Sequence, residues 1–190
     1  MDDKEHVALA ALPPDLFTIS FNGQSKSHRV AGYRVGWMCL CGNKSNVKGY
    51  IEGLNLLSSM RLCSNVPAQS IVQTCLGGYQ SADELLLPGG RIYDQREYIY
   101  KALCDIPGIS VVKPEAAFYI FPKLDKEKFN ISNDDQFALD LLRDKHILVT
   151  CGTGFNWKDP DHFRIVYLPN MEILKAATAK LADFLSYYHQ

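Results

Sequence analysis

Residues 23–36 read Gly-Gln-Ser-Lys-Ser-His-Arg-Val-Ala-Gly-Tyr-Arg-Val-Gly and hold the residues that point most directly to chemistry. Lys26 follows an apolar run and stands beside small residues, so its side chain can reach into a cleft. A lysine amine whose pKa is lowered by burial or a nearby cation becomes a nucleophile that forms a Schiff base with an aldehyde. Arg34 can offer its planar guanidinium to an anion such as phosphate. By themselves, the same two residues also suit a solvent-exposed turn lysine and a structural arginine.

Two strands and three helices are expected around this segment. Residues 16–21 and 35–41 are apolar, β-rich runs, and each ends at a pair of turn residues, Asn-Gly and Gly-Asn. Apolar residues then recur at helical spacing over residues 46–60. Proline and glycine signals bound the next two helices, which are expected over residues 67–76 and 91–106.

Shorter runs follow the third of these helices. Val111-Val112 and residues 117–121 are expected to pair as strands, and residues 134–145 to form a helix capped by Ser132. Two more strands and a last amphipathic helix are expected over residues 147–150, 162–167 and 170–188. The change of pattern favours two domains, an α/β part over residues 1–95 and an α+β part over residues 96–190.

The composition is that of an ordinary globular chain. Hydrophobic residues make up 47% and charged residues 22%, which excludes disordered, collagen-like and coiled-coil proteins. The net charge of −1 provides no field that would recruit nucleic acid or an anionic membrane. The apolar runs are too short to span a bilayer, and the charged start of the chain lacks the apolar core of a signal peptide. We therefore expect a cytoplasmic protein with neither nucleic acid nor membrane as a partner.

The cysteines favour the same compartment. There are six, and most have apolar neighbours, which is typical of buried free thiols in a reducing cytoplasm. Cys39 and Cys41 alternate with apolar residues as in a strand, and no second pair completes a zinc site. We expect no metal site.

The segment that carries Lys26 resembles a family signature. Gly23, Ser25, Lys26, Arg34 and Gly36 match the cofactor-lysine pattern of the class I/II aminotransferases, which are fold type I enzymes that use pyridoxal 5'-phosphate (PLP). The likeness is greatest to the bacterial glutamate–pyruvate (alanine) aminotransferases. It continues to the end of the chain through residues 29–37, 48–54, 61–69, 76–81, 88–91, 155–157 and 163–169.

Two residues depart from the pattern. Gln24 stands where the family usually has an apolar residue, and Arg29 where a small or apolar one is usual. Gly23 lacks the phosphate-binding hydroxyl that many relatives carry at this position. Contacts to the phosphate must therefore come from other residues.

The resemblance implies a role for each matching residue. Lys26 corresponds to the lysine that binds PLP as a Schiff base and moves the catalytic proton. Arg34 corresponds to the arginine that binds the PLP phosphate, and Ser25 to a small residue at the cofactor edge whose hydroxyl can reach that phosphate. Asn65 falls where the family has an asparagine near the partner subunit's active site, or else it is a simple helix N-cap. Arg164 corresponds to the arginine that binds the substrate α-carboxylate.

Tyr119 and the histidines are weaker candidates. Tyr119 resembles a tyrosine that faces the substrate, although core packing is the simpler expectation for it. His28 and His162 have no assignable catalytic role, and we expect both to be surface or structural residues.

The resemblance also implies a fold and a function. We expect an α/β chain that forms the C-terminal part of a PLP-dependent transferase fold, with the end of the large-domain sheet, interface helices and a small α+β domain. The implied activity moves an amino group between alanine or glutamate and 2-oxoglutarate or pyruvate. If complete, the protein is expected to be a homodimer that uses residues 46–90 at its interface.

The family's aspartate on the pyridine nitrogen is not matched in this sequence. It lies in an Asp-Glu-x-Tyr block that aligns before Met1, and Asp2, Asp3 and Asp15 match positions with other roles. We therefore expect the isolated chain to be inactive. The alternatives are a non-catalytic truncated remnant or interaction module, or another fold type I PLP enzyme such as a C–S lyase or a decarboxylase.

Overall fold

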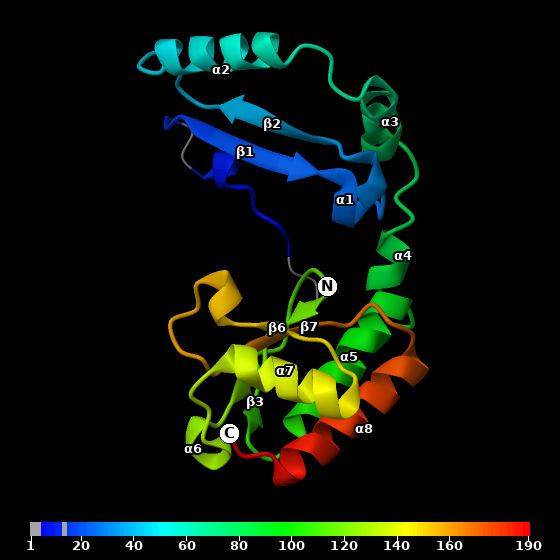
Figure 1. The fold of residues 1–190 in the computed structure, drawn as a ribbon. Coiled ribbons are helices and arrows are strands. Elements are labelled where there is room, and N and C mark those ends of the chain that lie inside the picture. Colours follow the sequence, from blue (N-terminus) through cyan, green and yellow to red (C-terminus); the bar gives the residue numbers. More distant parts are fainter. Residues whose placement is uncertain (1–4, 13–14) are drawn as a thin grey trace. The chain divides into compact units, whose positions relative to one another are not determined.

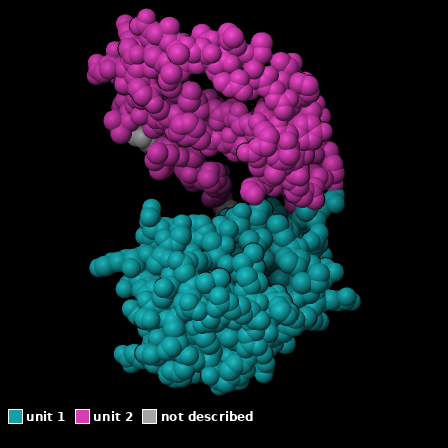
Figure 2. Space-filling view, viewed as in Figure 1, with its two compact units in different colours: residues 1–2, 84–190 teal, residues 3–83 magenta. Residues whose placement is uncertain are grey.

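The computed structural model describes residues 5–12 and 15–190, which form two compact units that divide between Asp83 and Glu84 (Figure 2). Asp2 and Asp3, considered above, lie outside the described residues. The expected boundary between residues 95 and 96 falls inside a helix, α5 (Arg91–Cys104). Among the described residues, no helix is long and apolar enough to cross a membrane.

The unit of residues 5–83 is built on one antiparallel strand pair (Figure 1). The strands β1 (Thr18–Gly23) and β2 (Gly36–Cys41) pair from Thr18↔Cys41 to Gly23↔Gly36. They are connected by two short helices, α1 (Gln24–Ser27) and η2 (Ala31–Tyr33). The remaining elements of this unit are η1 (Leu9–Ala11), α2 (Lys48–Arg61) and α3 (Val66–Gly77).

This unit buries little of its surface. Its buried described residues are Thr18, Gln24 and Ala68. The helix α2 has no buried residue, although its sequence is amphipathic enough to have been predicted from spacing. Large apolar side chains are therefore exposed on several of its elements, including Phe21, Met38, Leu56, Leu57, Met60 and Leu76.

The unit of residues 84–190 combines helices with short strands. A three-stranded antiparallel sheet has the order β4-β7-β6, from Tyr119–Ile120, Phe163–Val166 and Thr150–Cys151. A second pair joins β3 (Ile109–Ser110) to β5 (Lys123–Leu124). The helices are α5, α6 (Lys126–Phe129), α7 (Asp134–Lys145) and α8 (Met171–Tyr187), with η3 (Thr153–Phe155); α4 (Asp83–Leu86) spans the division between the units.

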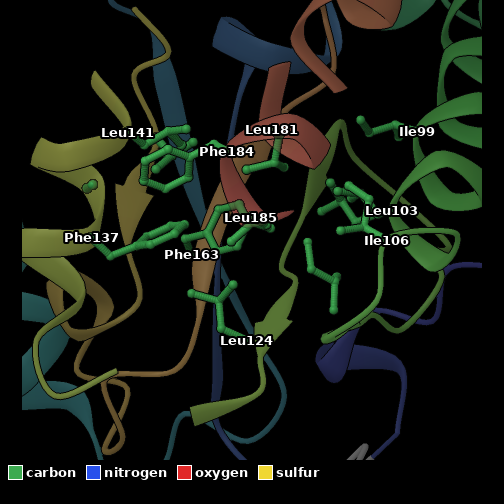
Figure 3. Close-up of a cluster of buried hydrophobic side chains, with 14 of the residues drawn as sticks. Ile99, Leu103, Ile106, Leu124, Phe137, Leu141, Phe163, Leu181, Phe184 and Leu185 are labelled. Atoms are coloured by element: carbon green, nitrogen blue, oxygen red, sulfur yellow. The ribbon is translucent and has the colours of Figure 1, made fainter. Parts of the chain in front are cut away.

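A continuous hydrophobic core fills this second unit (Figure 3). Phe137 and Leu141 of α7 are fully buried, and Phe163 of β7 and Phe184 of α8 lie against Phe137 at ring-centre distances of 5.2 and 6.1 Å. The helical spacing of apolar residues in α5, α7 and α8 produces this core, because each helix turns one apolar face inward.

Three expectations about the strands in this unit are wrong. The strand expected over residues 147–150 is only β6, which begins at Thr150 and ends at Cys151. Val111-Val112 is not a strand; the strand lies two residues earlier, at Ile109–Ser110, and pairs with β5. Val112 is 87% exposed, and the proline at position 114 cannot donate to a ladder. The strand expected over residues 117–121 shrinks to Tyr119–Ile120 and pairs with β7, because Ala117 has a positive φ of 59° that interrupts the extended backbone.

The expected cap of α7 is also wrong. Asn133, not Ser132, is the N-cap, and its Oδ1 accepts a hydrogen bond from Gln136 N at 3.1 Å. The Ser132 hydroxyl instead donates to Oε1 of Gln190 at 3.0 Å. The Ser132 side chain, which the local sequence predicts to cap α7, therefore binds Gln190 at the far end of the chain instead.

The cysteines are free, as expected, but they are not buried. Cys39, Cys63 and Cys104 are exposed, and Cys41, Cys75 and Cys151 are half-buried. The apolar neighbours that suggested burial are themselves largely exposed in residues 5–83, because that unit has almost no core.

Candidate active site

Lys26 lies at the point where β1 turns into α1. It is the third residue of this four-residue helix, and its side chain is exposed. The turn is closed by a hydrogen bond from the Gln24 backbone N–H to the Val35 carbonyl at 3.4 Å. The amine is therefore presented from a short, tied turn at the end of a strand.

Two glycines let the strands approach closely beside this turn. Gly23 and Gly36 face each other in the strand register. A Cβ on Gly36 would lie 2.9 Å from the Asn22 carbonyl oxygen, and one on Gly23 would lie 3.3 Å from the Val35 carbonyl oxygen. The spacing of these glycines in the sequence signature thus has a steric cause, since a side chain on Gly36 would force the strands apart.

Three side chains around Lys26 tie the turn to later parts of the same unit. Gln24 is fully buried, and its Nε2 donates to the Val72 carbonyl of α3 at 3.4 Å. His28 Nε2 lies 2.8 Å from the Cys75 carbonyl, and therefore carries the proton of that hydrogen bond. Arg29 donates to Ser81 Oγ at 3.1 Å.

Gln24 and Arg29, which depart from the family pattern, thus hold the Lys26 turn to later residues of the same unit. Gln24 and Arg29 both make contacts about fifty residues away along the chain, which explains why a polar residue occupies each position. His28 has the structural role that we expected. Gln24 Oε1 is buried without a hydrogen-bond partner among the described residues.

Arg34 follows η2 in a left-handed backbone conformation with φ of 53°. Its guanidinium is exposed, and one hydrogen bond, from Nη1 to the Ala31 carbonyl at 3.0 Å, fixes it locally. Within residues 5–12 and 15–190 it forms no ion pair. Most of its N–H groups therefore remain available to an anion.

Asn65 is the N-cap of α3, which confirms the simpler of its two expected roles. Its Oδ1 accepts from Ala68 N at 3.2 Å, and its Nδ2 donates to the Tyr33 carbonyl at 3.1 Å. The second bond places the start of α3 against the residue that precedes Arg34. Asn65 thereby lines an open groove of about 500 Å³ whose other lining residues are Arg29, Val30, Gly32, Tyr33, Pro67 and Ala68.

The residues of this unit fit a phosphorylated aldehyde. Lys26 would supply an amine for the aldehyde, and Arg34 would supply a guanidinium for the phosphate. Ser25, the residue before Lys26, is half-buried and its hydroxyl has no hydrogen-bond partner among the described residues, so this hydroxyl is available to the same phosphate. This donor set has the chemistry that PLP requires.

Arg164 belongs to the other unit, in the middle of β7. Its guanidinium carbon lies 4.5 Å from the centre of the Phe155 ring and 4.8 Å from that of Tyr119. Tyr119, for which core packing was the simpler expectation, is only half-buried and contacts this cation. Sequence reasoning missed Phe155, because no pattern links it to a strand that begins eight residues later.

A family model, "Aminotransferase class I and II", matches residues 2–179. The chain belongs to this family. Aminotransferases of this family use PLP. The match covers the strand pair, the Lys26 turn and most of the unit that holds Arg164.

The most similar relatives include alanine aminotransferases. The chain is 56% identical over 189 residues to the glutamate-pyruvate aminotransferase AlaA of Escherichia coli K12, covering 100% of this chain and 47% of the relative. It is 51% identical to an alanine aminotransferase of Mycobacterium tuberculosis, covering 100% and 44%. A crystal structure of an aminotransferase from Escherichia coli matches with a TM-score of 0.97 and 56% identity, over 100% of this chain and 47% of that one. The chain thus has the α/β fold of these enzymes and spans less than half of their length.

Proposed function

We propose that this chain carries the cofactor-lysine and carboxylate-binding parts of an aminotransferase. The enzyme would move an amino group between alanine or glutamate and 2-oxoglutarate or pyruvate. The observation that carries the proposal is the Lys26 turn, which presents an amine at a strand end, in the same connection between β1 and β2 that carries the available guanidinium of Arg34. The 56% identity to a glutamate-pyruvate aminotransferase along the whole chain supports the choice of substrates.

Each residue has a defined task in this proposal. PLP, when bound, supplies an electron sink for the carbanion at the substrate Cα. Lys26 would hold the cofactor at its aldehyde, and the same amine would move the proton at the substrate Cα. Arg34 and Ser25 hold the phosphate, and Arg164 binds the substrate α-carboxylate through the planar edge of its guanidinium. Asn65 fixes the backbone next to Arg34 through the Tyr33 carbonyl.

The same proposal assigns the domains and the assembly. Residues 1–95 would be the C-terminal part of the cofactor-binding large domain, and residues 96–190 the small domain. The exposed apolar side chains of α2, Leu56, Leu57 and Met60, are suited to an interface, which supports a homodimer that uses residues 46–90. We place the enzyme in the cytoplasm.

A chimera tests the proposal. The chain is joined to the N-terminal remainder of the Escherichia coli relative, and pyruvate formation from alanine and 2-oxoglutarate is measured. We expect turnover by the chimera, its loss in Lys26→Ala, and its retention in Lys44→Ala, which removes an exposed lysine of a neighbouring loop. We expect the 190-residue chain alone to show no turnover.

The alternatives predict different outcomes. A chimera that cleaves a cysteine thioether but does not transaminate would favour a C–S lyase. A folded chimera without any PLP-dependent activity would favour a non-catalytic remnant. Equal activity of the Lys26→Ala and parent chimeras would overturn the role of Lys26.

A further inference from the structure

The guanidinium of Arg164 is held by aromatic rings rather than by a carboxylate. Phe155 and Tyr119 both lie within 4.8 Å of its central carbon. Within the described part of the chain, its one direct hydrogen bond, from Nη2 to Thr150 Oγ1, is long at 3.5 Å. Its Nε is buried and has no partner among the described residues. The rings therefore provide the main restraint, and N–H groups stay unpaired for a ligand.

Phe155 is not part of the hydrophobic core. Its side chain is 47% exposed, and it ends η3, where its backbone N–H donates to the Gly152 carbonyl at 2.8 Å. Its ring meets the ring of Phe121 edge-on, with centres 6.3 Å apart. Core burial does not explain the position of a half-exposed ring, whereas its contacts with Arg164 and Phe121 define it.

A buried carboxylate fixes the ring against which Phe155 packs. Asp161 is 4% exposed, lies 2.6 Å from His162 Nδ1, and accepts from Trp157 Nε1 at 3.2 Å. The His162 ring stacks on Phe121 with centres 4.9 Å apart. A continuous series of contacts thus runs from Asp161 through His162 and Phe121 to Phe155.

We propose that Phe155 is a positioning residue for Arg164 and that Asp161 anchors the aromatic cluster behind it. The inference rests on the proposed role of Arg164 in binding the substrate carboxylate. An arginine side chain loses rotamer freedom when it binds an anion, and rings that already restrict it reduce that cost. Phe155 then contributes to carboxylate affinity without touching the carboxylate.

NMR on the full 190-residue chain tests this proposal through the Nε–Hε signal of Arg164. The signal is assigned with Arg164→Gln, and its order parameter is measured before titration with pyruvate. In Phe155→Ala we expect a lower order parameter and pyruvate affinity weaker by about two- to fivefold, the effect of losing one cation–π contact at an exposed ring. Phe155→Tyr keeps a ring and should restore both values.

A second variant controls for loss of an aromatic ring as such. Tyr187 is 55% exposed and lies 5.1 Å from Lys145, so Tyr187→Ala removes a similar contact elsewhere in the same unit. It should leave the Arg164 signal and pyruvate affinity unchanged. Unchanged order and affinity in Phe155→Ala would overturn the inference. Equal pyruvate binding by Arg164→Gln and the parent chain would instead overturn the carboxylate role of Arg164, and the order parameter of the free chain would still decide the role of Phe155.

Discussion

The two units of this chain differ in how they are held together. The unit of residues 84–190 has a continuous core in which Phe137, Leu141 and Phe163 are fully buried. The unit of residues 5–83 has one buried apolar residue among those described, Ala68, and is organised by a strand pair and by polar anchors such as Gln24. The proposed cofactor residues therefore lie in the unit that buries little of its own apolar surface, whereas Arg164 lies in the unit that has a continuous hydrophobic core.

Truncating a core residue should give the largest difference between the units. Phe137→Ala in residues 84–190 should lower the free energy of unfolding by about 3–5 kcal/mol, because it leaves a cavity in a close-packed core. Leu57→Ala removes a side chain that is 64% exposed, and should change the free energy of unfolding by less than about 0.5 kcal/mol. Urea denaturation of both variants measures the effect. A larger loss for Leu57→Ala would show that residues 5–83 have a core of their own.

Alkylation of two half-buried cysteines compares the surroundings of one thiol in each unit. Burial, together with the neighbouring Asp135 carboxylate, raises the pKa of Cys151 to about 11. The thiolate is the reactive form, so at pH 8 Cys151 should react about 100-fold more slowly than an ordinary thiol. Cys75, half-buried in residues 5–83, should react much faster, as iodoacetamide labelling and mass spectrometry would show.

The same shift sets the direction of a pH effect. Because the folded-state pKa of Cys151 is raised, its contribution to stability is complete below the unfolded pKa and is lost as pH rises toward about 11. Equal labelling rates at Cys75 and Cys151 would contradict the raised pKa of Cys151.

Two glycines test the close strand approach beside Lys26. Gly36→Ala places a Cβ 2.9 Å from a backbone oxygen and should destabilise the chimera by about 1–3 kcal/mol. Gly32→Ala, with nothing within 4 Å of the new Cβ, is the matched control and should have little effect. Thermal unfolding compares them. Equal effects would show that the strand pair is loose enough to accept a side chain at Gly36.

The smallest expected effect is the acid sensitivity of the aromatic cluster. Burial has the largest single influence on Asp161 and raises its pKa. The hydrogen bond and charge of His162, the hydrogen bond from Trp157 and the charge of Lys123 together outweigh burial and lower the pKa below its usual value. Stability from this carboxylate is therefore present above the unfolded pKa and is lost as pH falls through the folded pKa. The stability difference between the parent chain and Asp161→Asn, about 1 kcal/mol at pH 7, should shrink as pH falls below about 4. A difference that stays constant to pH 2 would contradict the assignment.

The elements that the sequence predicted best are those with long patterns. The helical spacing of residues 46–60 corresponds closely to α2. The strand expected over residues 16–21 is present as β1, but it runs from Thr18 to Gly23, so Asn22 and Gly23 lie inside the strand and do not end it. The pairing of two-residue strands could not be predicted, because Ile109 and Leu124 meet through turns that leave no periodic signal. The N-cap of α7 was predicted wrongly because Ser132 hydrogen-bonds to Gln190, a residue at the far end of the chain that the local sequence does not reveal.

The candidate site also has residues that the sequence predicted and contacts that it did not. Lys26, Arg34 and Arg164 were predicted because a family signature includes them, and the structure adds why Gly23 and Gly36 accompany them. The anchoring of the turn by Gln24 and the contact of Phe155 with Arg164 join segments far apart in sequence. Contacts between distant segments leave no local pattern in the sequence, so they could be identified only from the three-dimensional structure.

Trapping the cofactor tests the central claim most directly. The chimera is incubated with PLP, reduced with borohydride and digested, and the modified peptide is identified by mass spectrometry. We predict that Lys26 carries the reduced cofactor and that Arg34→Ala lowers the yield at limiting PLP through loss of a phosphate contact. Modification of another lysine, such as Lys44, with Lys26 unmodified would contradict the proposal.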